Sequence, residues 1–174
     1  MDYNIIANGY TNLYKEEQIR KLSIIVSALN IKNSDNVLDV GCGTAFYFNK
    51  IPGNVKGIEP SKKMIENSLY KNKIIYGHAE KLPFKDNSFN IVISLTSIHN
   101  FANYKKGILE MKRIGIKFGF SVLKRSKNFQ KINSFIQKNF KIIKNINDIQ
   151  DKIIICEKII NKTKQKRSMI NNQN

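Results

Sequence analysis

The sequence has two cysteines among its 174 residues, few acidic residues and no long apolar run. Cys42 and Cys156 lie too far apart in the chain to suggest a zinc cluster or a disulfide framework, so we expect a reducing, cytoplasmic setting. No apolar stretch approaches the roughly 20 residues that span a bilayer, and no basic segment followed by a long apolar one opens the chain. Secretion, membrane insertion and a membrane partner are therefore not expected.

Acidic residues are scarcest in the second half of the chain. The whole sequence carries 30 basic and 13 acidic residues, a net charge of +17. Residues 1–100 hold 12 basic and 9 acidic residues, a net of +3, whereas residues 101–174 hold 18 and 4, a net of +14. An AT-rich coding sequence can enrich lysine, but a bias of that origin should be spread evenly. The uneven charge indicates either a polyanionic partner or a solvated basic face.

Apolar spacing predicts strands that alternate with helices through most of the chain. The expected strands are 37–40, 55–59, 73–76, 89–95, 119–124, 140–146 and 152–159. The expected helices are 10–29, 45–50, 104–114, 127–138 and one that opens at Pro60–Ser61 with Met64, Ile65 and Leu69 on one face. This order predicts an α/β, Rossmann-like, doubly wound sheet of seven strands, mostly parallel with an antiparallel last strand and helices on both faces. One domain is expected over residues 1–160, followed by a basic, solvated tail over 161–174.

A glycine-rich loop follows the first predicted strand. Asp39-Val40-Gly41-Cys42-Gly43-Thr44 stands where backbone approaches a ligand closely in open parallel sheets. Glu59 ends the next strand, where a carboxylate can accept hydrogen bonds from both hydroxyls of an adenosine ribose. The dinucleotide-binding fingerprint has a small residue at the position of the bulky Phe46, so the loop does not fit a dinucleotide. No P-loop sequence is present to hold a triphosphate.

The loop and its surroundings resemble the class I S-adenosylmethionine-dependent methyltransferases, of the methyltransferase type 11 group. Besides the loop preceded by Val37-Leu38, the resemblance rests on three further segments, Tyr3-Asn4-Ile5-Ile6-Ala7-Asn8-Gly9-Tyr10, Gly57-Ile58-Glu59-Pro60-Ser61 with Met64, and Gly77-His78-Ala79-Glu80-Lys81-Leu82-Pro83-Phe84 with Asp86-Asn87-Ser88-Phe89. It covers roughly residues 3 to 125 and implies transfer of a methyl group from S-adenosylmethionine.

The resemblance also implies roles for individual residues around the cofactor. Asp39 and the backbone of Gly41 and Gly43 would hold its methionine end, and Glu59 its ribose. Pro60 or Met64 would flank the adenine. The turn His78-Ala79-Glu80 would read the adenine edge, and Tyr10, Cys42 and Ser94 complete the implied cofactor-binding set. This sequence departs from the family pattern at three positions, because Ala45 replaces a frequent third glycine, His78 a usual aspartate and Asn90 a common aspartate.

The segment Ser94-Leu95-Thr96-Ser97-Ile98-His99-Asn100-Phe101 follows the fourth predicted strand, where an acceptor-facing motif would lie. It lacks the Asn/Asp-Pro-Pro-aromatic tetrad with which family members methylate exocyclic amino groups, and neither cysteine lies in a Pro-Cys pair. His99 is the side chain whose ordinary pKa suits proton transfer near neutrality, so it is the candidate catalytic base; packing under a helix is the equal alternative. No metal site is predicted.

Three functions stay open at this point. The basic second half, with Lys105, Lys106, Lys112, Arg113, Lys117, Lys124, Arg125 and Lys127 in one stretch, favours a methyl acceptor such as tRNA, rRNA or another macromolecule. The alternatives are a small-molecule methyltransferase and a non-catalytic cofactor-binding subunit. No separate RNA-binding domain is recognisable, so RNA would be bound by this surface, by the tail or by a partner such as an activator subunit. The oligomeric state does not follow from the sequence.

Overall fold

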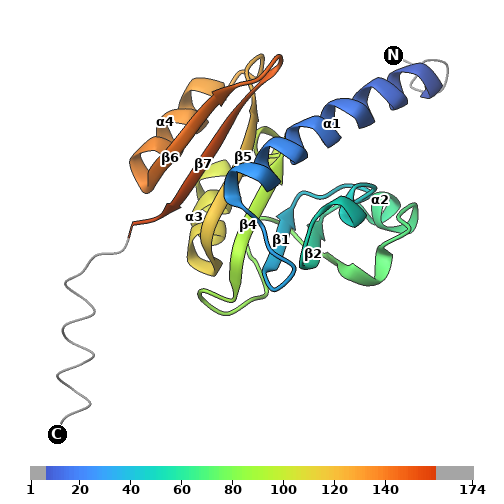
Figure 1. The fold of residues 1–174 in the computed structure, drawn as a ribbon, viewed down its shortest axis with the longest axis horizontal. Coiled ribbons are helices and arrows are strands. Elements are labelled where there is room, and N and C mark those ends of the chain that lie inside the picture. The colour runs from blue at the N-terminus through green and yellow to red at the C-terminus, as the bar shows by residue number, and fades with distance from the viewer. Residues whose placement is uncertain (1–6, 160–174) are drawn as a thin grey trace, which may run out of the picture.

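The buried apolar runs form one sheet in the computed structural model, which describes residues 7–159 and, among these, the side chains from Tyr14 on. Seven strands in this part of the chain take the order β3-β2-β1-β4-β5-β7-β6 (Figure 1). Their bounds are β1 Asn36–Val40, β2 Asn54–Glu59, β3 Ile74–Tyr76, β4 Phe89–Leu95, β5 Gly115–Leu123, β6 Phe140–Asn147 and β7 Asp151–Lys158.

Strand direction divides the sheet into a parallel part and a closing antiparallel part. β3, β2, β1, β4 and β5 pair in parallel, whereas β7 pairs antiparallel with both β5 and β6. Only three residues separate β6 from β7, which is too short for a crossover helix. The predicted fold class, with its single antiparallel strand at the end of the chain, is confirmed.

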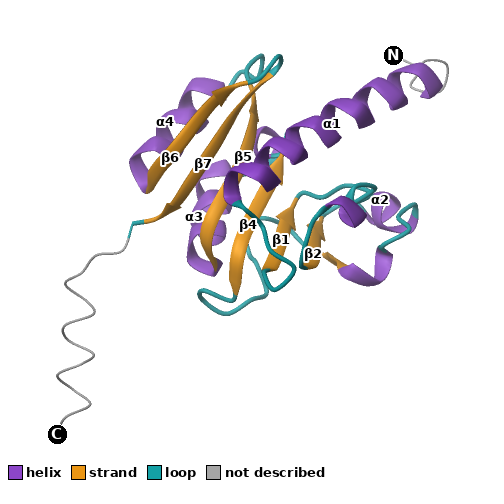
Figure 2. Ribbon diagram, viewed as in Figure 1, coloured by secondary structure: helices purple, strands orange, loops and turns teal. Residues whose placement is uncertain are grey.

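Helices cover both faces of the sheet (Figure 2). The long helix α1, Ala7–Leu29, crosses one face and packs on β4, β5 and β7, while α3, Tyr104–Ile114, and α4, Phe129–Asn139, pack on the other. α1 packs very close to β5 at Gly119. A Cβ added at this glycine would lie 2.4 Å from the Cγ2 atom of Ile25. The remaining elements are short: α2 Lys62–Glu66 and the 3₁₀ turns η1 Phe48–Lys50, η2 Lys71–Lys73 and η3 Ile98–Asn100.

Each face of the sheet carries its own apolar layer, because neighbouring strand residues point to opposite faces. The layer under α1 includes Leu22, Ile25 and Ile93, and the layer under α3 and α4 includes Phe118 and Ile132. All five side chains are essentially inaccessible to solvent. The central strands β1, β4, β5 and β7 are therefore mostly buried on both sides, and the carboxyl edge of the sheet is left to the connecting loops.

Two predicted helices were wrong in part. The stretch 45–50 holds only the turn η1, because Ala45 has a left-handed φ of 53° and Pro52 ends any helix soon after. α2 ends at Glu66, and Leu69 is 94% exposed instead of lying on its apolar face. Few residues separate the glycine loop from β2, which leaves room for the turn η1 but not for a longer helix.

No helix within residues 7–159 is both long enough and apolar enough to cross a bilayer. The predicted tail, 161–174, lies outside the described residues, as does the side chain of Tyr10. The domain boundary at residue 160 stays a prediction.

Candidate active site

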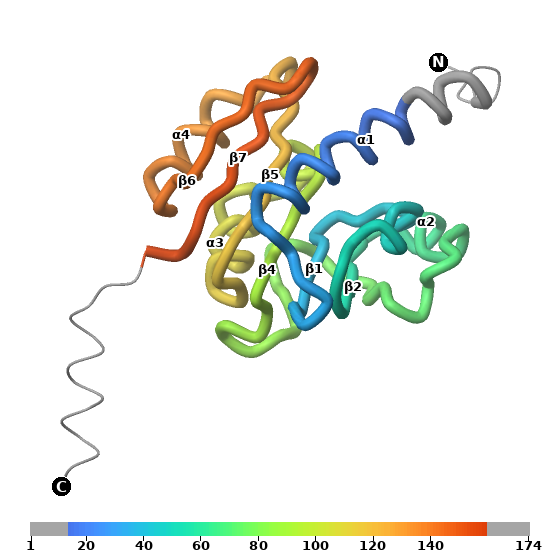
Figure 3. The backbone as a smooth tube through the Cα atoms, in the orientation of Figure 1, coloured from blue at the N-terminus to red at the C-terminus, as the bar shows by residue number. Residues whose placement is uncertain are grey.

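The carboxyl ends of the parallel strands open into a trough and a neighbouring cavity. The trough consists of two adjoining hollows of about 640 and 410 Å³ that share Gly41, Gly43 and Met64 as walls, and we call it the glycine-loop trough. A third hollow of about 390 Å³, called here the His99 cavity, adjoins it across Thr96 and Asn100. The larger hollow is lined by side chains of α1 and of the segment between β1 and β2, which Figure 3 draws beside each other.

The glycine loop turns back through left-handed backbone. Gly41 has a φ of 77° and Gly43 a φ of 59°, and the N–H of Gly41 donates to the carbonyl of Ile58 over 2.8 Å. A Cβ at Gly41 would lie 2.6 Å from Oγ of Ser97, whereas no described atom comes within 4 Å of one at Gly43. Gly41 thus permits close packing against the loop after β4, and Gly43 leaves open space in the trough.

Glu59 closes β2 with its carboxylate at the trough wall. Its Oε2 accepts a hydrogen bond from the N–H of Gly43 over 2.8 Å, and its Oε1 accepts one from the N–H of Ser61 over 3.0 Å. The residue is 8% exposed and lines the 410 Å³ hollow. Each oxygen has two acceptor positions, so both can still accept a hydrogen bond from a ligand.

Asp39 lies deeper, beneath the glycine loop. Its Oδ2 accepts a hydrogen bond of 2.7 Å from the hydroxyl of Tyr47, while its buried Oδ1 has no hydrogen-bond partner among the described residues. Burial raises the pKa of the Asp39 carboxyl to about 7, against the lowering effect of the Tyr47 hydroxyl. Asp39 is fully buried and lines neither hollow of the trough, whereas its partner Tyr47 lines the larger one. An unpartnered buried oxygen is a group that a polar partner would complete.

Most of the remaining predicted cofactor contacts meet at the same hollow. With Glu59, the walls of the 410 Å³ hollow include five predicted residues, namely Pro60, Met64, His78, Ala79 and Glu80. Cys42 lines the larger hollow, where burial raises the pKa of its thiol far above the ordinary range, which excludes a thiolate nucleophile.

Ser94 does not reach the trough, contrary to its predicted place. Its hydroxyl is buried and donates to the carbonyl of Val40 over 2.8 Å, with Oγ of Ser97 at 2.6 Å. Ser97, three residues further on, lines the hollow instead. Asn90 lies at the opposite edge of the sheet, where its Oδ1 accepts from the N–H of Asn36, so its departure from the family pattern does not touch the trough.

His99 lines the cavity on the far side of Thr96 and not the trough itself. It is half-buried in the turn η3, and its Nδ1 is buried without a hydrogen-bond partner among the described residues. Burial lowers the pKa of the imidazole below its ordinary value, so the ring is neutral at pH 7 and free to accept a proton.

A buried ionic cluster beneath the His99 cavity escaped the sequence reasoning. Lys21 and Asp151 are both fully buried, with the ammonium 3.0 Å from a carboxylate oxygen, and Glu17 is the second partner of Lys21. The hydroxyl of Thr96 lies 3.1 Å from the Lys21 ammonium and 2.8 Å from Asp151, and its residue has a left-handed φ of 50°, unusual for a β-branched side chain. Side chains from α1, the β4 end and β7 therefore hold the wall between trough and cavity.

Tyr14 also escaped the sequence reasoning, although it lines the trough and the His99 cavity alike. The helical spacing of α1 identified apolar positions only, and Tyr14 and Lys21 carried no motif. The predicted strand 152–159 began one residue after Asp151, so this carboxylate was read as part of a link.

The basic stretch of the sequence divides between the two edges of the sheet. Lys112, Arg113 and Lys117 lie at the amino edge of β5, where Arg113 is held by Glu110 and Asp86 and Lys112 lies over the ring of Phe140. The other five lie at the carboxyl edge, in the first turn of α3 and in the loop after β5, and all are exposed: Lys105, Lys106, Lys124, Arg125 and Lys127. Lys112, Arg113 and Lys117, which were predicted to belong to a polyanion-binding surface, thus lie at the opposite edge of the sheet from the site.

Comparison with known proteins matches this geometry. Residues 38–123 match the model of a family described as a methyltransferase domain. The chain is 34% identical over 151 residues to an uncharacterized protein of Methanocaldococcus jannaschii, covering 82% of this chain and 59% of that protein. It is 31% identical over 102 residues to the demethylmenaquinone methyltransferase of Staphylococcus epidermidis, covering 52% of this chain and 42% of the enzyme. The chain thus spans about half the length of the curated relatives it matches.

A solved structure shows the same fold over most of the chain. The putative methyltransferase in complex with the Haloferax volcanii Trm112 methyltransferase activator aligns with a TM-score of 0.70 at 13% identity, covering 88% of this chain and 96% of that one. A seven-stranded sheet with a glycine loop after β1 and an acid at the end of β2 defines a cofactor-binding α/β domain. The family match makes it more specific: the chain belongs to the class I S-adenosylmethionine-dependent methyltransferases.

Proposed function

We propose that this protein binds S-adenosylmethionine in the glycine-loop trough and transfers its methyl group to an acceptor that approaches over the β4–β5 half of the sheet. The observation that carries the proposal is Glu59, whose carboxylate faces the trough while two backbone N–H groups hold it. The open space at Gly43 and the unpartnered Oδ1 of Asp39 fit a bulky polar ligand. The bound cofactor would supply an electrophilic methyl group on sulfonium.

The residues of the chain act by holding and orienting. Glu59 accepts hydrogen bonds from the ribose hydroxyls, and Asp39 and the Gly41–Gly43 backbone bind the methionine end. Pro60, Met64 and the turn at His78–Glu80 enclose the adenine. Holding two reactants in line contributes on the order of 7–11 kcal/mol, so such a site needs a base only where the acceptor loses a proton. His99, neutral at pH 7, is the proposed base for that case.

Glu59→Gln tests the cofactor site. Replacing the carboxylate with an amide weakens two charge-assisted hydrogen bonds of about 1.5–3 kcal/mol each, so the affinity for S-adenosylmethionine should fall at least 30-fold in calorimetric titration. Glu66→Gln, an exposed acid on α2 outside the trough walls, is the matched control and should bind like the unchanged protein. Unchanged affinity in Glu59→Gln would refute the assignment of the trough.

For the acceptor we propose RNA or another macromolecule. The support is the exposed basic set at the carboxyl edge, together with the net +14 of residues 101–174. A small-molecule acceptor is the second candidate, since the His99 cavity has the size of a small-ligand site and the Staphylococcus epidermidis relative is a demethylmenaquinone methyltransferase. Incubating the protein with labelled S-adenosylmethionine and separate RNA, protein and small-molecule extracts identifies the fraction that gains label.

Two further possibilities concern a partner subunit and the absence of catalysis. The Haloferax volcanii neighbour is crystallised with a methyltransferase activator, so an activator subunit belongs among the proposed partners. A non-catalytic cofactor-binding role predicts tight binding of S-adenosylmethionine with no labelled fraction, even with an activator present. Turnover on an identified acceptor would exclude that role, and full turnover by His99→Ala would remove His99 as the base.

A further inference from the structure

The His99 cavity differs in chemistry from the trough beside it. Four separate segments build it: α1 with Glu17 and Gln18, the turn η3 with His99, the β5–α4 loop with Arg125, and the β6–β7 turn with Gln150. Thr96 separates it from the trough, and the buried cluster under Thr96 fixes that wall. The cavity is thus a built feature of the fold, in which the lining residue Thr96 is fixed from below by the fully buried Lys21 and Asp151.

The interior and the rim of this cavity carry opposite charge. Inside and below lie two carboxylates, Glu17 and Asp151, against the single ammonium of Lys21. At the rim, the loop of residues 124–127 holds three exposed cations with no carboxylate partner among the described residues, namely Lys124, Arg125 and Lys127. An anionic group is therefore favoured at the rim and disfavoured inside, where neutral hydrogen-bonding groups fit.

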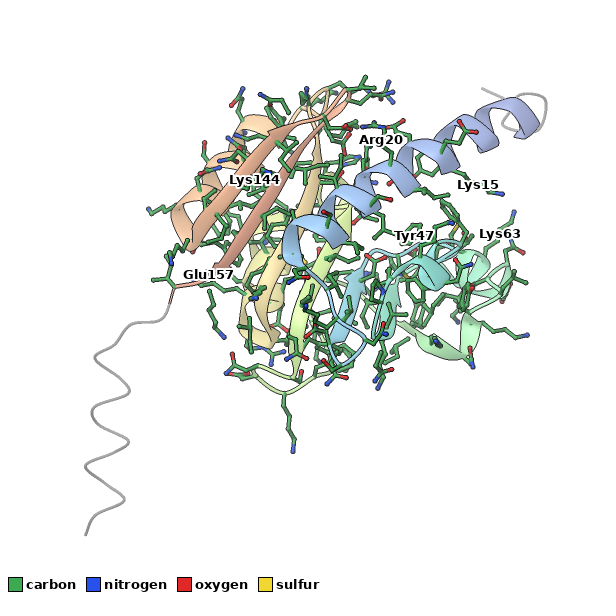
Figure 4. All side chains as sticks on the ribbon, in the orientation of Figure 1. Lys15, Arg20, Tyr47, Lys63, Lys144 and Glu157 are labelled. Atoms are coloured by element: carbon green, nitrogen blue, oxygen red, sulfur yellow. The ribbon has the colours of Figure 1, made fainter. Side chains whose placement is uncertain are left out.

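Arg125 stands apart from the other arginines of the described chain. Arg20 is paired with Asp148, and Arg113 with Glu110 and Asp86, whereas no carboxylate in residues 14–159 pairs with Arg125. Figure 4 shows Arg20 on α1. An exposed guanidinium that also lines a cavity can bind a phosphate through two parallel hydrogen bonds.

We propose that the His99 cavity is the acceptor site and takes a phosphorylated acceptor. A neutral polar part of the acceptor enters among Gln18, His99 and Gln150, and its phosphate stays at the rim on Arg125 with Lys124 and Lys127 beside it. The phosphate can belong to a polynucleotide or to a small phosphorylated metabolite, and the charge pattern serves both. The inference rests on the proposed methyltransferase function and specifies the acceptor's chemistry.

The test is binding of defined probes with the trough saturated by S-adenosylhomocysteine, and again without it. The probes are a ten-nucleotide single-stranded RNA, uridine 5′-monophosphate and uridine. We expect at least one of the two phosphorylated probes to bind about tenfold more tightly than uridine, and Arg125→Gln to remove about tenfold of that affinity. RNA binding that exceeds mononucleotide binding supports a polynucleotide, and equal binding supports a small phosphorylated acceptor.

Lys144→Gln is the control variant. Lys144 is exposed on β6, the outermost strand of the sheet (Figure 4), and does not line the cavity; its replacement also removes one positive charge. Equal affinities in Arg125→Gln and Lys144→Gln, or uridine binding as tight as that of its phosphate, would overturn the inference. Titration of S-adenosylmethionine stays separate, so loss of cofactor binding would refute the proposed function without deciding the acceptor chemistry.

Discussion

The two sides of Thr96 are held together by different interactions. On the trough side, backbone groups of Gly41 and Gly43 and the carboxylate of Glu59 shape the walls, the Asp39–Tyr47 hydrogen bond lies beneath them, and little ionic pairing is involved. On the cavity side, a buried ion pair between Lys21 and Asp151 ties α1 to β7. Backbone turns keep a ligand surface open, whereas a buried charge pair stabilises the fold as long as both partners are present.

The largest effect should come from breaking that pair. Lys21→Met removes the ammonium and leaves Asp151 buried without its partner, which costs about 3–5 kcal/mol of the free energy of unfolding. Urea denaturation followed by circular dichroism measures the loss.

Lys141→Met is the comparison variant, because Lys141 pairs with Glu157 in an exposed position over 2.7 Å. Removing such a pair costs about 0–1 kcal/mol. The double variant Lys21→Met/Asp151→Asn should recover part of the stability, since it removes the stranded carboxylate as well. Equal losses in Lys21→Met and Lys141→Met would mean that the buried cluster does not stabilise the cavity side.

The same contrast explains what could be read from the sequence. Asp39, the two glycines and Glu59 lie within 21 consecutive residues, and a strand–loop–strand pattern is enough to bring them to one edge. The cluster joins Lys21 to Asp151, 130 positions later, and no local pattern marks either residue. The succession of strands and helices along the chain and the antiparallel closure were predicted from apolar runs and link length. Ser94 entered the cofactor set through the family resemblance alone, and no residue pattern showed that its hydroxyl would bond to the carbonyl of Val40 while Ser97 lines the hollow.

A second prediction concerns the pH dependence that burial gives to the trough side. The pKa of Asp39 is about 7 in the folded protein and about 3.9 in an unfolded chain. Between these values the folded state keeps a proton that the unfolded state has released, so stability falls as pH rises from about 4 to 7 and is flat above. Asp39→Asn has no carboxyl group to titrate at this position. Its free energy of unfolding, relative to that of the unchanged protein, should therefore rise by up to about 4 kcal/mol across that window.

Denaturation of both proteins at pH 4, 5.5, 7 and 8 checks the difference. The affinity of Asp39→Asn for S-adenosylmethionine should fall although its stability rises, since the carboxylate is proposed to bind the methionine end. Tyr47→Phe removes the hydroxyl that donates to Asp39, so it should raise the pKa of that carboxyl and extend the fall in stability to higher pH. A constant difference between Asp39→Asn and the unchanged protein would contradict the raised pKa.

The smallest stability change should separate the two loop glycines. Gly43→Ala puts a methyl group into open space at a φ of 59°, which costs about 1 kcal/mol of stability but occupies the trough. Gly41→Ala also meets Ser97, 2.6 Å from its Oγ, and should lose about 2–3 kcal/mol. Thermal melting and titration with S-adenosylmethionine distinguish them: Gly43→Ala should lower the melting temperature less than Gly41→Ala does, and should bind the cofactor at least tenfold more weakly than the unchanged protein. Normal cofactor affinity in Gly43→Ala would show that the ligand does not approach the backbone there, and would move the cofactor toward the Glu59 end of the trough.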